Sequence, residues 1–131
     1  MTTNRESEIR EESLSLAVAA YNMVGNMDQV STHHVRSLIV DNCFHVSSLI
    51  AKAFSTVQNE DSEQFVARGL EQLNKIIKTT LEISITSDEG KSIELFLHIA
   101  EELKVELIEL LSAIKLKNSE SFSPKLEPTC I

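Results

Sequence analysis

The residues best suited to chemistry in this chain are its four histidines and two cysteines. His33 and His34 are adjacent, and Arg36 follows at the start of a predicted helix. An exposed histidine on a helix can accept and pass on a phosphoryl group. Phosphotransfer bundles place a small residue one turn after that histidine, whereas Leu38 stands one turn after His34. We therefore interpret the pair as ordinary residues at the entry of a helix and keep histidine phosphotransfer as the alternative function.

Two pairs of an acid and a histidine have the spacing of one helical turn. They are Asp41 with His45, and Glu94 with His98. A di-iron bundle requires Glu-x-x-His pairs on two helices, and the chain contains no Glu-x-x-His. Both pairs flank the predicted apolar stripes, where such side chains form hydrogen bonds on the surface. The sequence predicts no metal site and no cofactor.

The cysteines do not point to catalysis either. Cys43 falls on an apolar stripe, where a free cysteine behaves as a small hydrophobic residue. Cys130 stands one residue from the end of the sequence, so we expect no internal disulfide and a reducing, cytoplasmic location. Arg36 and His45 lie too far apart for the arginine–histidine pair of small helical nucleases. We expect a protein that is not an enzyme.

The charge of the chain limits the partners that it can bind. The chain contains twelve lysines and arginines and twenty aspartates and glutamates, which gives a net charge of −8. Such a chain repels phosphate backbones and does not favour direct nucleic-acid binding. Only the segment from residue 31 to 59 is not acidic. A contact with a partner or with RNA would therefore use the basic residues of the second and third segments, namely His33, His34, Arg36, Arg68, Lys75 and Lys78.

These residues must be positioned by helices, because apolar residues recur three and four apart along four long segments. The first two segments run from about residue 5 to 24 and 31 to 57. The third starts after residues 59–61 and ends within 81–86, and the fourth follows a cap at 86–88 and continues to 117. Gly25 is a candidate left-handed stop, and Asp61 or Ser62 a candidate cap. The predicted stripe of the first segment comprises Ile9, Leu14, Ala17, Val18, Tyr21 and Val24. The aromatic residues before the tail are likewise expected on or beside the core stripes.

Together these segments predict an all-α fold, an antiparallel up-and-down four-helix bundle over residues 1–117. Residues 118–131 contain both prolines and are predicted to be a disordered tail. No run of about twenty apolar residues occurs, so no membrane contact is expected. The second segment has few charges, which predicts that neighbouring helices or another subunit cover more than one of its faces.

Short sequences in all four segments resemble one family. They are Ala-Ala-Tyr-Asn at 19–22, an early Arg36 in an apolar second segment, Leu-Glu-Gln-Leu-Asn-Lys-Ile-Ile at 70–77 and Ile-Ala-Glu-Glu-Leu at 99–103. The chain resembles the four-helix bundle proteins encoded in rRNA intervening sequences, a group that includes the accessory variability determinant (Avd) of diversity-generating retroelements. The resemblance implies a homopentamer. For the retroelement members it also implies docking on a reverse transcriptase and its template RNA.

The chain departs from that family in being acidic and in lacking the Asn-Ile-Ala-Glu-Gly stretch of the rRNA-linked members. From the resemblance we therefore expect the bundle and its self-association in this chain, but not direct RNA binding. The predicted function is a non-enzymatic, self-associating adaptor that docks on a protein or ribonucleoprotein partner, such as a reverse transcriptase.

Overall fold

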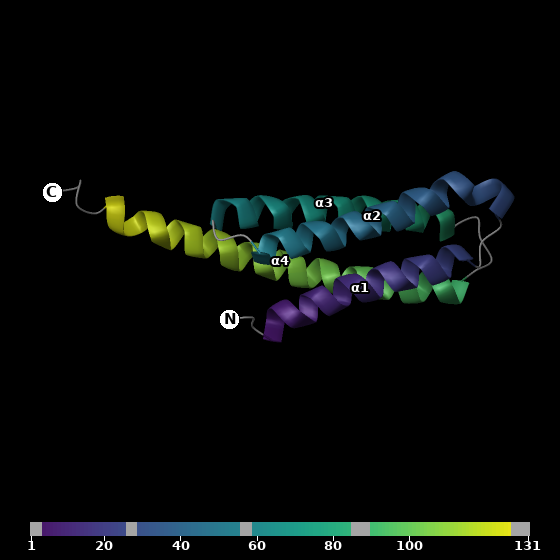
Figure 1. Cartoon of the computed structure of the whole chain (residues 1–131), viewed down its shortest axis with the longest axis horizontal. Helices are drawn as coiled ribbons and strands as arrows, with labels where there is room; N and C mark the ends of the chain where they lie inside the picture. Colours follow the sequence, from purple (N-terminus) through teal and green to yellow (C-terminus); the bar gives the residue numbers. More distant parts are fainter. Residues whose placement is uncertain (1–3, 26–28, 56–58, 85–89, 127–131) are drawn as a thin grey trace.

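The computed structural model consists of four helices, which are α1 (Asn4–Gly25), α2 (Gln29–Ser55), α3 (Asn59–Ser84) and α4 (Gly90–Leu126). These are the residues that the structure describes, and side chains are described within them for 5–25, 37–55, 61–82 and 93–118. No described residue lies in a strand. The predicted all-α four-helix bundle is confirmed (Figure 1).

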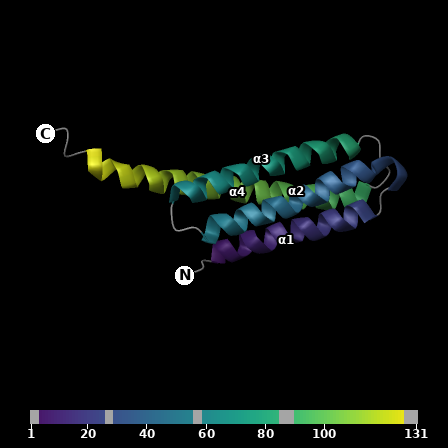
Figure 2. The same ribbon diagram turned by 45° about the horizontal axis from the view of Figure 1, so that its top comes forward.

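Successive helices run in opposite directions (Figures 1 and 2). The contacts between α1 and α2 give the same result, because Arg10 lies over the Phe54 ring while Ser13, further along α1, accepts a hydrogen bond from the earlier Ser47. Among the described residues, α1 and α3 each pack against both α2 and α4. The four helices therefore form a square in which diagonal helices do not meet.

The core lies along the axis of this square and contains almost only aliphatic side chains. Phe96 is the one fully buried aromatic residue of the described part. Cys43 is buried, as predicted, and burial raises the pKa of its thiol to about 12. The buried Thr80 hydroxyl donates to the carbonyl oxygen of Ile76 at 2.8 Å, so its polar group is satisfied.

Helix α1 presents a different face to the core from the one predicted. Ile9, Ala17 and Val24 are buried as expected. Leu14, Val18 and Tyr21 are instead 59%, 61% and 69% exposed. The core-facing row contains Ser13, Leu16, Ala20 and Met23, and its small members let α1 pack closely. Both rows have helical spacing, and the row with smaller residues faces inward.

Helix α2 packs against two neighbouring helices, α1 and α3, and its cover by another subunit stays a prediction. Its described outer face remains exposed and is built from small or neutral residues, including Ser48, Ala51 and Ser55. Phe44 is 57% exposed, so the expectation that the aromatic residues belong to the core is wrong for Phe44 as well as for Tyr21. Among the described residues, α2 contacts α1 and α3 but not α4.

Several helix ends differ from prediction. Helix α1 ends at Gly25, but no described glycine has a positive φ, so the stop is not left-handed. Helix α3 begins at Asn59, and the Ser62 hydroxyl donates to the Ala53 carbonyl oxygen at 3.0 Å instead of capping α3. Helix α4 continues past the predicted boundary at residue 117 to Leu126. In the described part of the chain, no helix is both long and apolar enough to cross a bilayer.

Candidate functional site: the groove between α1 and α4

The basic residues predicted as a contact surface belong to two helices. His33, His34 and Arg36 fall in the first turns of α2, and their side chains lie outside the described residues. Arg68, Lys75 and Lys78 are exposed on α3, at spacings of seven and three that place them on one outward face. Lys75 Nζ lies 3.8 Å from Glu71 Oε1, so an acid interrupts this face.

The acid–histidine pairs form different partnerships from those predicted. Asp41 accepts a hydrogen bond from the Ser37 hydroxyl at 3.2 Å. His98 Nε2 lies 2.6 Å from Glu102 Oε1, one turn after it, rather than pairing with Glu94. Among the described residues, no three histidine, cysteine or acidic side chains are grouped so as to hold a metal ion.

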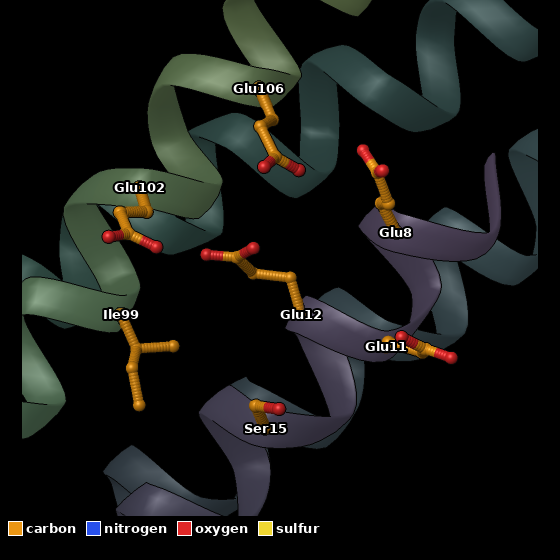
Figure 3. Close-up of a pocket in the computed structure, with 7 residues that line it drawn as sticks. All are labelled: Glu8, Glu11, Glu12, Ser15, Ile99, Glu102 and Glu106. Atoms are coloured by element: carbon orange, nitrogen blue, oxygen red, sulfur yellow. The ribbon is translucent and has the colours of Figure 1, made fainter. Parts of the chain in front are cut away.

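The described surface has a groove between α1 and α4. One half is acidic, with a volume of about 380 Å³, and is lined by Glu8, Glu11, Glu12, Ser15, Ile99, Glu102 and Glu106. Glu12 reaches from α1 towards α4, where Glu102 and Glu106 lie, and Glu11 points away from them (Figure 3). Five carboxylates and no basic side chain line this half of the groove.

The carboxylates of the acidic half change each other's affinity for protons. Burial and, to a smaller extent, the neighbouring Glu106 and Glu102 together raise the pKa of Glu12 to about 7. Burial also raises the pKa of Glu106. The Oε2 atom of Glu106 is buried and has no hydrogen-bond partner among the described donor groups. Because its pKa is about 7, Glu12 is half-protonated near neutral pH. In its protonated form it can donate a hydrogen bond to Glu106.

The other half of the groove is apolar. It has a volume of about 350 Å³ and is lined by Leu14, Ser15, Val18, Ala19, Asn22, Leu95 and Ile99. Ser15 and Ile99 line both halves, so the two halves form one continuous groove. Leu95 is 58% exposed, which is close to the exposure of Leu14 and Val18. The groove thus offers carboxylates at one end and exposed aliphatic carbon at the other, a combination that binds cationic and apolar groups.

Sequence reasoning did not find this groove, although its signals are present. Glu8 and Glu12 are four apart on α1, and Glu102 and Glu106 are four apart on α4. Like charges at this spacing repel each other on one helix face. Two such pairs in one chain indicate a negative face, but their meeting depends on how the two helices are rotated about their axes. The sequence pattern does not fix that rotation.

Comparisons with protein-family models, with curated proteins and with solved structures found no match. The site is therefore interpreted from the chemistry of its own side chains.

Proposed function

We propose that this chain is a non-enzymatic adaptor that self-associates and docks on a protein partner through the outer surface of α1 and α4. The observation that carries the proposal is the row formed by Leu14, Val18 and Tyr21, each at least 59% exposed. Single exposed apolar residues are ordinary on protein surfaces. These three follow each other on one helix face and adjoin the apolar half of the groove, and contiguous patches of this kind are typical of interaction sites.

Two further residues extend this apolar surface on either side of α1. Leu95 adds to it from α4. Phe44 lies one turn before Ser47, whose hydroxyl donates to the carbonyl oxygen of Ser13 at 3.2 Å. Because α1 and α2 are antiparallel, Phe44 lies at the level of Ala17 on α1. The exposed apolar surface thus spans three helices.

The acidic half of the groove favours one class of partner. Five carboxylates attract a basic protein surface and repel RNA phosphates. The resemblance to retroelement accessory proteins supplies a candidate partner, a reverse transcriptase bound to its template RNA. The acidic groove supports docking on the protein of such a complex rather than on its RNA.

Light scattering coupled to size exclusion tests the proposal. We expect the wild-type chain to exceed its monomer mass of 14.6 kDa as its concentration rises. The double variant Leu14→Gln, Val18→Gln is expected to reduce this association, because it removes the apolar row without touching the core. The control Val105→Gln, Ile108→Gln changes two exposed residues of α4 that do not line the groove, and association should be unchanged. A wild-type monomer at every concentration would rule out self-association, and equal effects of both variants would rule out this surface.

A further inference from the structure

The exposed face of α1 has the spacing of a seam between two helices. Six exposed residues follow each other in alternating steps of four and three, the repeat with which one helix packs along another. They are Ser7, Glu11, Leu14, Val18, Tyr21 and Gly25. We call these six residues the α1 seam. The seam is about 27 Å long and covers most of the 22 residues of α1.

The α1 seam faces away from its own bundle. Among the described residues, α1 packs against α2 and α4, and its buried row lies on the other side of the helix. Leu14, Val18 and Tyr21 are each at least 59% exposed. A Cβ atom built on Gly25 would meet nothing within 4 Å. A second helix can therefore lie along the seam without displacing α2 or α4.

The charges of α1 determine the direction in which a second α1 can lie. Residues 5–12 contain two arginines and four glutamates, whereas residues 13–25 contain no charged side chain. A parallel pair would bring the two acidic halves together, with Glu11 of one copy against Glu11 of the other. An antiparallel pair places each acidic half beside the uncharged half of the other copy. Since like charges across a contact are unfavourable, the charge pattern favours the antiparallel pair.

One antiparallel register pairs every residue of the α1 seam. If Leu14 of one copy lies level with Val18 of the other, each step forward along one helix is a step back along its partner. Glu11 is then level with Tyr21, and Ser7 with Gly25. The Tyr21 phenol can donate a hydrogen bond to the Glu11 carboxylate, so the one charged group of the seam has a partner. A shift by seven residues in either direction separates Leu14 from Val18 and leaves seam residues unpaired.

The register is the same seen from either copy, as a two-fold axis requires. We propose that two copies of this chain form a dimer through their α1 seams, with the two α1 helices antiparallel about a two-fold axis level with residue 16. Two pairs of Leu14 and Val18 meet at the centre of this contact, and a pair of Glu11 and Tyr21 lies on each side. Such a contact is self-complementary and closes at two subunits. This inference rests on the self-association in the proposed function and specifies the arrangement that forms it.

Disulfide cross-linking at the ends of the seam tests the arrangement. The two variants are Ser7→Cys and Gly25→Cys, both at exposed positions outside the aliphatic centre of the contact. Each is made in a chain that carries Cys130→Ser and keeps the buried Cys43. The φ of Gly25 is not positive and the space beside it is open, so a side chain fits there. Each variant is oxidised alone and in an equal mixture, and the products are separated on a non-reducing gel.

The mixture should give a covalent dimer of about 29 kDa, twice the mass of 14.6 kDa. Each variant alone should give at least roughly tenfold less of it, because identical ends of the two seams lie about 27 Å apart, beyond the reach of a disulfide. A parallel pair would give the reverse result. The control is a mixture of Ser7→Cys with Ser48→Cys, an exposed position on α2, which should give no more dimer than Ser7→Cys alone.

The outcomes separate this inference from the proposed function. A wild-type monomer at every concentration in light scattering rejects both. If wild type associates but either variant cross-links efficiently with itself, or the mixture gives no more dimer than the control, the antiparallel α1 pair is rejected and the adaptor proposal stands. A wild-type assembly larger than a dimer rejects closure at two subunits.

Discussion

Glu12 holds a proton under conditions in which most glutamates are ionised. Its pKa of about 7 in the folded chain lies well above the ordinary value of 4.5, because the carboxyl is partly buried and faces Glu106 and Glu102. The charged groups nearby also include Glu8, and Arg5 opposes them by lowering the pKa of Glu106. Among the described residues, the groups that cause both shifts lie on α1 and α4.

The stability of the bundle should therefore fall as pH rises. The folded chain keeps a proton on Glu12 that the unfolded chain loses above pH 4.5, so the free energy of unfolding declines between pH 4.5 and about 7. We expect Glu12→Gln to flatten this decline and to be more stable than wild type at pH 8 by on the order of 2 kcal/mol, since the open groove screens part of the repulsion. Urea unfolding at a series of pH values measures both effects.

Glu101→Gln is the matched control for this prediction, because Glu101 is an exposed acid of α4 outside the groove. It should keep the pH dependence of wild type. Equal slopes for wild type and Glu12→Gln would show that Glu12 is ionised throughout this range.

At the scale of the helices, Gly69 of α3 lies where α3 packs against Leu49 of α2. A Cβ atom built on this buried glycine would lie 3.9 Å from Leu49 Cβ, an ordinary van der Waals distance. Its φ is not positive, so alanine can adopt the same backbone. The glycine is therefore not required for the helices to pack, and it weakens the interior of α3.

Gly69→Ala should stabilise the bundle by about 0.5–1 kcal/mol, because alanine favours the helix and restricts the unfolded chain. Chemical denaturation would show a higher midpoint with an unchanged slope. Destabilisation by this substitution would mean that α2 and α3 lie closer together than the structure places them.

The elements show how far sequence patterns determine this fold. Four apolar periodicities, nearly free of glycine and proline and joined by three short turns, predict four helices, because few other folds use such segments. Helix α1 shows the limit, since the rows that contain Leu16 and Val18 are both apolar and both helical in spacing. Only packing against α2 and α4 selects the row with small residues. The groove depends on which row of α1 faces the core, so the sequence could not predict it. The burial of Cys43 could be predicted, because Cys43 lies on the one apolar stripe of its segment. The family resemblance and the roles of His33 and His34 stay predictions.

Across the whole molecule, the described packing of α4 against its own bundle extends as far as Asn118. Leu107 is the last fully buried residue, and partly buried residues of α4 continue the core to Ile114. Asn118 contacts Glu63 beyond it. The stability of the bundle should therefore depend on α4 up to about Asn118.

Deleting residues 119–131 tests this limit. The melting temperature should stay within a few degrees of wild type, because every described core residue is kept. Light scattering should show unchanged self-association, because Leu14, Val18 and Leu95 are kept. A large fall in melting temperature would show that the end of α4 stabilises its own bundle.

Tyr21 determines the intrinsic fluorescence of the protein. It is the only tyrosine, the chain has no tryptophan, and its ring is 69% exposed on the outer face of α1. All intrinsic fluorescence excited near the tyrosine band therefore originates from one ring beside Val18. Emission from the unlabelled protein reports directly on whether water or another protein surface surrounds that part of α1.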